Sequence, residues 1–165
     1  MSVKDNFTPE EWDKVLSGPA TAAAAILAAA PSGLTGIIAE GIATVKAMKE
    51  LAEASSAPLL QAIAASLKPE DEERQREERQ RDGQRFKTFE EAKNAMLERL
   101  RSAFWLVQTK TTPEDVSAYQ QYVVGVAERV AQAAKEGGFL GIGGEQVSQA
   151  EKDTLNEIRS TLGIA

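Results

Sequence analysis

An uncharged stretch from Val15 to Ala39 dominates the pattern of apolar and polar positions along the chain. Most of it is alanine, and a helix that is apolar on every side is normally buried. Gly and Pro residues interrupt the stretch at Gly18-Pro19 and at Pro31-Ser32-Gly33. Closely spaced Gly and Pro residues usually end helices. We therefore predict that the first helix ends at Gly18-Pro19, and that an Ala/Gly-rich helical hairpin follows it, with arms near 20–30 and 35–54.

Amphipathic helices are predicted on both sides of this hairpin. Thr8 with Glu11, Thr88 with Glu91 and Ser148 with Glu151 have the spacing of a capping box, which marks a helix start. A further helix is expected from Pro58 to about Lys68, and another begins at Thr112-Pro113. The last of these carries apolar residues spaced three, four, three, four and three apart: Val116, Tyr119, Val123, Val126, Val130 and Ala133. The predicted fold is all-α, a bundle of about six or seven helices around the central Ala/Gly-rich hairpin.

A charged segment at 69–86 separates the Ala-rich half of the chain from the C-terminal helical half. From Pro69 to Arg85 it has no large apolar side chain, and Glu–Arg pairs recur four residues apart. This spacing suits a solvated helix with ion pairs, whereas the composition also suits a connector. Both interpretations stay open, within one helical domain over 1–165.

The amino-acid composition argues against several classes of function. The chain has no histidine and no cysteine, so the commonest acid/base, thiol and transition-metal chemistry is missing. A net charge of −6 argues against a nucleic-acid partner. Residues 1–6 are polar and do not resemble a signal peptide, so a cytoplasmic location is expected. We predict a protein that is not an enzyme and that needs no cofactor.

Two groups of residues are candidate binding sites for ions. The Gly-rich loop 137–144 could bring backbone amides to an anion, but it lacks the Lys-Ser/Thr of a phosphate loop and Glu145 follows it. A helix end with a hydrophobic plug explains the loop better. Four carboxylates near apolar stripes could bind Mg²⁺, although each also fits a solvent-exposed edge: Glu40, Glu98, Glu128 and Glu157. No metal site is therefore predicted.

Aromatic and apolar residues offer a possible surface for a partner or ligand. The candidates are Trp105, Tyr119, Tyr122, Phe139 and Leu140. Such residues can line a groove, but more often they belong to the core, with tyrosine hydroxyls reaching solvent.

Both ends of the chain resemble an uncharacterised bacterial family of small all-helical proteins. The similar segments are Phe7-Thr8-Pro9-Glu10-Glu11-Trp12 and Gly137-Gly138-Phe139-Leu140-Gly141-Ile142-Gly143-Gly144, followed by Val147-Ser148 and Glu151. The resemblance implies a bacterial cytosolic helical protein, and it transfers no catalytic residue.

Three functions are compatible with these observations. The first is a non-enzymatic interaction or structural protein, which acts through a helix-lined groove or by self-association. The second is a membrane-associating helical hairpin, although the apolar pieces are shorter than the roughly 20 residues that span a bilayer. The third is a small-molecule or anion binder that uses the loop 137–144.

Overall fold

The computed structural model describes residues 2–29, 33–67, 86–136 and 147–164. These ranges contain one short 3₁₀ helix, six α-helices and no strand, so the predicted all-α bundle is confirmed. The elements are η1 (Val3–Asn6), α1 (Pro9–Ala29), α2 (Gly33–Glu53), α3 (Pro58–Ser66), α5 (Phe89–Lys110), α6 (Pro113–Glu136) and α7 (Gln149–Thr161). The Gly-rich loop 137–144 and nearly all of the charged segment 69–86 lie outside the described residues.

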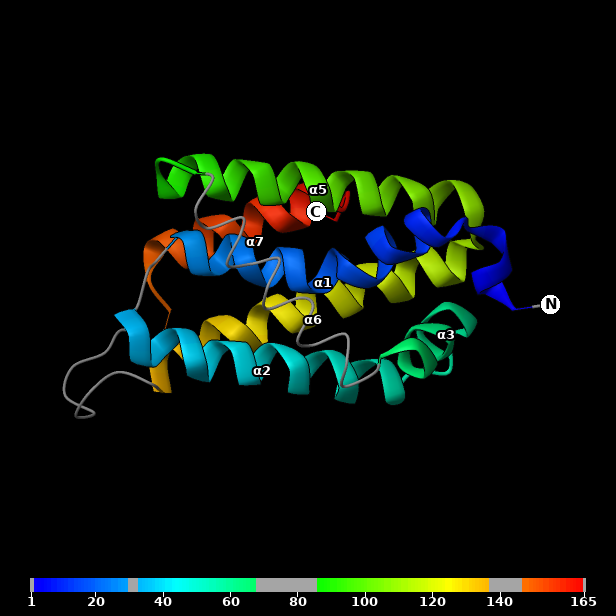
Figure 1. The fold of residues 1–165 in the computed structure, drawn as a ribbon, viewed down its shortest axis with the longest axis horizontal. Coiled ribbons are helices and arrows are strands. Elements are labelled where there is room, and N and C mark those ends of the chain that lie inside the picture. The colour runs from blue at the N-terminus through cyan, green and yellow to red at the C-terminus, as the bar shows by residue number, and fades with distance from the viewer. Residues whose placement is uncertain (1, 30–32, 68–85, 137–146, 165) are drawn as a thin grey trace.

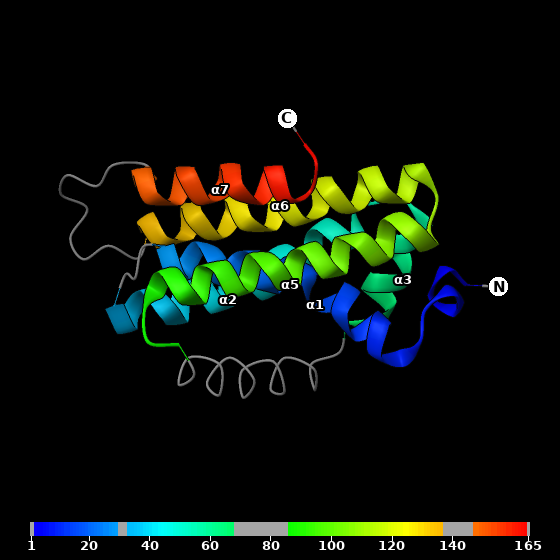
Figure 2. The ribbon, with the colours of Figure 1, turned by 90° about the horizontal axis from the view of Figure 1, so that it is seen from above.

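Helix α1 occupies the middle of the bundle (Figure 1). It packs most extensively along α5 and α6, and it also contacts α7 and α2. Helix α2 packs chiefly against α6, and α3 lies near η1 at the end of the bundle that carries the N-terminus. Seen from above, α7 covers one half of α6 and ends near the middle of the molecule (Figure 2).

The alanine-rich part of α1 is buried, as its lack of charge predicts. Ala22, Ala23, Ala25 and Ile26 have almost no exposed surface, because alanine allows the axes of neighbouring helices to approach closely. The side chains of residues 34–40, in the second arm, lie outside the described part. Further along α2 the helix has a buried side, as at Met48, and an exposed side, as at Ile42.

The predicted helix end at Gly18-Pro19 is wrong, because α1 continues through it to Ala29. A proline inside a helix has no N–H for the carbonyl four residues earlier, which here belongs to Val15. The Tyr119 hydroxyl of α6 donates a hydrogen bond to that carbonyl at 2.8 Å. Gly18 makes the approach possible, since a Cβ at this position would lie 2.0 Å from the Tyr119 hydroxyl oxygen. A tertiary contact thus replaces the bond that proline removes.

Three further side chains of α6 form hydrogen bonds with the backbone of other elements: Tyr122, Gln120 and Asp115. The Tyr122 hydroxyl donates to the Met48 carbonyl of α2 at 3.2 Å, and the Gln120 amide donates to the Leu162 carbonyl that follows α7 at 2.7 Å. Burial raises the pKa of both tyrosines, Tyr119 and Tyr122, which keeps their hydroxyls as neutral donors. Helix α6 therefore connects α1, α2 and the end of α7 through hydrogen bonds from its side chains to their backbone carbonyls.

The fourth such contact caps α3 from a distance. Ala57, which precedes α3, offers no side-chain cap. The buried carboxylate of Asp115 instead accepts the Leu59 backbone N–H at 2.9 Å, and its second oxygen accepts the Thr112 hydroxyl at 3.1 Å. A carboxylate at a helix N-terminus meets unsatisfied amides and the positive end of the helix dipole.

The helix ends follow the local sequence closely. The predicted capping boxes of Thr8 with Glu11 and of Ser148 with Glu151 are both present. Thr88 caps α5 as expected, but Glu91 reaches back to the amide of Lys87 and not to that of Thr88. At the other end of α7, Gly163 adopts a φ of 68°, which turns the chain so that Ile164 packs against the core.

Replacing Gly18 by Ala should lower the free energy of unfolding by about 2–3 kcal/mol, because the new methyl group overlaps the Tyr119 hydroxyl. Urea unfolding would measure the loss. In a Tyr119→Phe background the same change should cost less, because the overlapping oxygen is gone. Gly41→Ala in α2 is the matched control: its Cβ meets nothing within 4 Å, so it should stabilise by up to about 1 kcal/mol. Equal effects at the two glycines would contradict the close approach.

Replacing Asp115 by Ala should destabilise the protein by about 1–3 kcal/mol, because the Leu59 amide loses its buried acceptor. Asp115→Asn should cost less, since an amide oxygen can still accept that bond. Hydrogen exchange should show faster exchange at Leu59. Glu114→Ala, an exposed neighbour in the same helical turn, serves as the control and should change stability by less than about 0.5 kcal/mol.

Candidate functional site

The structure separates the residues that were predicted to form a partner surface. Trp105 on α5 is 60% exposed. Tyr119 and Tyr122 are buried, and their hydroxyls reach backbone carbonyls and not solvent. Phe139 and Leu140 lie outside the described residues. The tyrosines therefore belong to the core, and Trp105 alone of the three described candidates is available to a partner.

Trp105 belongs to a straight row of exposed side chains on α5, which we name the α5 outer row. Its members are Asn94, Glu98, Arg101, Trp105 and Gln108, spaced four, three, four and three residues apart. This spacing keeps all five on one side of a helix with 3.6 residues per turn. The row is polar except for its tryptophan.

A cleft of about 390 Å³ adjoins the α5 outer row, between α5 and α7. It is lined by Leu97, Arg101, Asn156, Glu157, Ser160 and Thr161. Arg101 belongs to both the row and the cleft, and Trp105 follows one helical turn later. The row and the cleft thus form one continuous surface, with amide, hydroxyl and charged groups around one large aromatic side chain.

Ion pairs neutralise most of the charges along this surface. The Lys93 ammonium of α5 lies 2.9 Å from Glu157 of α7, and its hydrogen bond to that carboxylate raises the pKa of Lys93 despite partial burial. Arg101 pairs with Glu98 one turn away on α5. The pair between α5 and α7 fixes one end of the cleft. The surface as a whole carries no large field of one sign.

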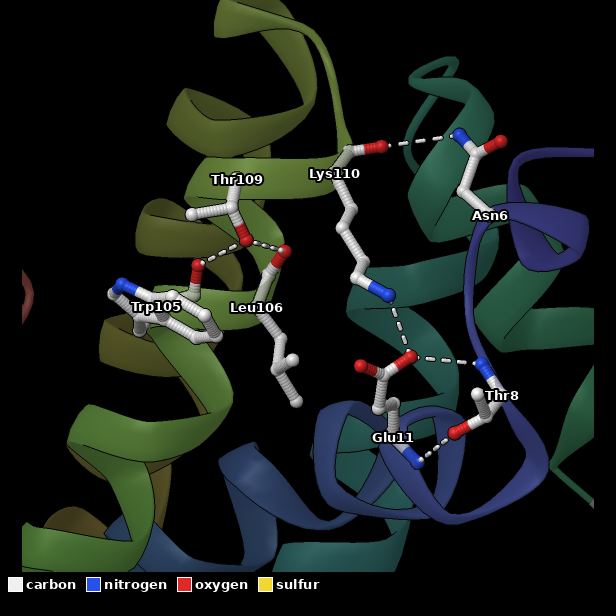
Figure 3. A network of polar contacts seen from close by, with 7 residues as sticks. All are labelled: Asn6, Thr8, Glu11, Trp105, Leu106, Thr109 and Lys110. Atoms are coloured by element: carbon white, nitrogen blue, oxygen red, sulfur yellow. Dashed lines mark hydrogen bonds and ion pairs between the residues drawn. The ribbon is translucent and has the colours of Figure 1, made fainter.

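The N-terminal segment holds the end of α5 that lies just beyond Trp105 (Figure 3). The Lys110 ammonium lies 2.7 Å from the Glu11 carboxylate, which also accepts the Thr8 amide at 2.8 Å. The side-chain amide of Asn6 donates to the Lys110 carbonyl at 3.0 Å. These contacts hold the last turn of α5 in place, so Trp105 is presented by a fixed framework.

The four carboxylates weighed as metal ligands do not come together. Glu157 pairs with Lys93, Glu98 with Arg101, and Glu128 with Arg159 at 2.5 Å, whereas the side chain of Glu40 lies outside the described residues. In the described part of the chain, no three acidic residues are grouped so that they could hold a metal ion.

The shifted pKa values in the described part of the chain all move away from pH 7. The pKa of Glu11 is lowered, and those of Lys93, Tyr119 and Tyr122 are raised. Each of these shifts favours the protonation state that the group already has at neutral pH. None of them therefore prepares a general acid or base for catalysis near pH 7.

Sequence reasoning identified Trp105 but missed its neighbours. The spacing of the outer row could have revealed Arg101 and Gln108, since it repeats on the polar side of α5. The cleft could not be found in this way, because Asn156 and Ser160 reach it only when α7 lies beside α5.

Comparison with known proteins adds no relative. The chain matches no protein-family model, no curated protein and no solved structure. Over the described ranges, no helix has both the length and the apolar character needed to cross a membrane.

The contact between Glu11 and Lys110 should make the free energy of unfolding depend on pH in the acidic range. The Lys110 ammonium and the Thr8 amide lower the pKa of Glu11 below its usual 4.5 in the folded state. This contact therefore stabilises the fold above about pH 4.5, and its contribution is lost as the pH falls through the lowered pKa. An NMR titration of the carboxyl group would measure that pKa directly.

Lys110→Met should raise the pKa of Glu11 toward 4.5 and should weaken the acid dependence of urea unfolding. Lys110→Arg keeps the positive charge and serves as the control. An unchanged Glu11 pKa in Lys110→Met would show that the ion pair does not form in solution.

Proposed function

We propose that the chain is a non-enzymatic interaction protein, and that its binding surface is the α5 outer row with the adjoining α5–α7 cleft. The observation that carries this proposal is the 60% exposure of Trp105. Tryptophan is among the residues that contribute most to binding energy at protein interfaces. The buried framework behind it is already ordered, which lowers the entropic cost of binding.

The polar groups beside Trp105 support a protein partner. An interface commonly has an aromatic anchor surrounded by a polar rim, and here Arg101, Asn156 and Ser160 supply hydrogen-bonding groups near the anchor. Because Arg101 and Glu157 are already paired, a partner need not bring a strong charge to neutralise them.

The alternative of a membrane-inserting hairpin has less support. The alanines of α1 are buried against α5 and α6, so insertion would require the central helix to leave the core. The alternative of an anion site depends on the loop 137–144, outside the described residues. The bacterial origin and the cytoplasmic location remain predictions from the sequence.

Site-specific photo-crosslinking in cells that produce the protein tests the proposal. A benzophenone amino acid in place of Gln108 lies on the outer row and leaves Trp105 intact. Gln61 on α3 is the matched control, since it is also an exposed glutamine. We expect adducts from position 108 and none from position 61.

Trp105→Ala should abolish the adducts from position 108, whereas Phe89→Ala should leave them unchanged. Phe89 is 62% exposed on the same helix, and its position 16 residues earlier places it on the other side of α5. Adducts that persist in Trp105→Ala, or no adduct at position 108, would refute the proposal.

A further inference from the structure

We infer that the partner of the α5 outer row is a second copy of this chain, with the two α5 helices antiparallel across a two-fold axis. This inference rests on the proposed function, because it uses the same surface. Its argument is the order of chemical groups along the row, which becomes complementary to itself when the row is reversed.

The two-fold axis would pass between Arg101 and Trp105, which are neighbours on the row. Reversal about that point places Arg101 of each copy against Trp105 of the other. A guanidinium group stacks favourably on an indole ring, and Arg101 can do so while its edge still bonds to Glu98. A two-fold interface forms this contact twice.

The next positions outward are also compatible. Glu98 of one copy would meet Gln108 of the other, so the carboxylate accepts a hydrogen bond from a neutral amide. The spacing of four, three, four and three is the spacing at which two helices keep a common line of contact. Both pairs come from exposed residues that need no rearrangement of the core.

Two other arrangements of the same row bring like charges together. A parallel pair would set Glu98 against Glu98 and Arg101 against Arg101. An antiparallel pair centred on Arg101 would again oppose the two guanidinium groups. Like charges in direct contact are unfavourable, so charge disfavours these two arrangements. An antiparallel pair centred between Glu98 and Arg101 would pair opposite charges but would set Trp105 against Asn94. Only the register centred between Arg101 and Trp105 places a guanidinium group on the exposed indole, so the stacking of Arg101 on Trp105 selects it.

The dimer is expected to be weak and reversible. The row is polar apart from Trp105, and one helix-to-helix contact buries less than the roughly 1,200 Å² of a standard interface. The hydrated row also lets the monomer persist without its partner. Trp105 should supply most of the binding energy.

Sedimentation equilibrium of the purified full chain over a range of concentrations tests for the dimer. The wild type should show a reversible monomer–dimer equilibrium, and Trp105→Ala should weaken the association at least tenfold. Phe89→Ala and Ile42→Ala are controls of similar exposure, 62% and 59%, and should leave it unchanged. A wild type that stays monomeric, or equal weakening by all three variants, would overturn the inference.

Disulfide formation tests the register, because the chain has no cysteine of its own. Chains carrying Glu98→Cys are mixed with chains carrying Gln108→Cys. The disulfide between the two different variants should form faster than a disulfide between two copies of the same variant. Arg101 and Trp105 stay intact in both variants. If disulfides between two copies of the same variant predominate, the proposed register is excluded.

The two proposals fail separately. If the purified chain remains monomeric while position 108 still crosslinks to a different protein in cells, the self-association is wrong and the proposed interaction surface stands. If no adduct forms at position 108, the surface itself is wrong.

Discussion

The hydrogen bond from the Tyr119 hydroxyl to the Val15 carbonyl is the interaction on which the architecture depends most. Proline at position 19 leaves that carbonyl without its helical donor, in the middle of the most buried helix. A buried carbonyl that is left without a hydrogen-bond donor lowers the free energy of unfolding by about 1–3 kcal/mol. The contact with α6 therefore stabilises the continuous α1, and Gly18 provides the space in which the two helices meet.

The same logic extends from this bond to the other elements around α6. Its side chains form hydrogen bonds with backbone groups of α1, α2, α3 and the end of α7, through Tyr119, Tyr122, Asp115 and Gln120. Helix α5 packs on α1 through buried apolar side chains such as Leu100 and Phe104, and its polar contacts to other elements include partly buried ion pairs of Lys93 and Lys110. Directional bonds to a buried backbone fix the inner helices. Ion pairs at the edge leave one side of α5 hydrated and available.

Local patterns predicted the parts of the fold that local physics decides. The capping residues at Thr8 and Ser148 mark their helices correctly, and the three-to-four spacing of Val123, Val126 and Val130 identifies the buried side of α6. The predicted helix end at Gly18-Pro19 is wrong because the donor that replaces the missing proline N–H is Tyr119, more than 100 residues away in the chain. The residues of the predicted partner surface also differ in whether they are buried. Periodicity shows that Tyr119 and Trp105 belong to helices, but only the packed bundle shows which of them is covered.

The polarity of the α5 outer row determines what kind of interaction it can support. A row of Asn94, Glu98, Arg101 and Gln108 is stable in water, so the monomer has no need of a partner to fold. Each copy of the chain carries a net charge of −6, which opposes the approach of a second copy at long range. The row itself contains one acid and one base, so the contact is locally neutral once the copies meet. Salt at about 0.1 M screens charges beyond roughly 10 Å, and it therefore weakens the repulsion more than the close stacking of Arg101 on Trp105. Association through this surface should thus strengthen as salt is added from low concentration, which is opposite to the behaviour of an interface formed by complementary charged surfaces.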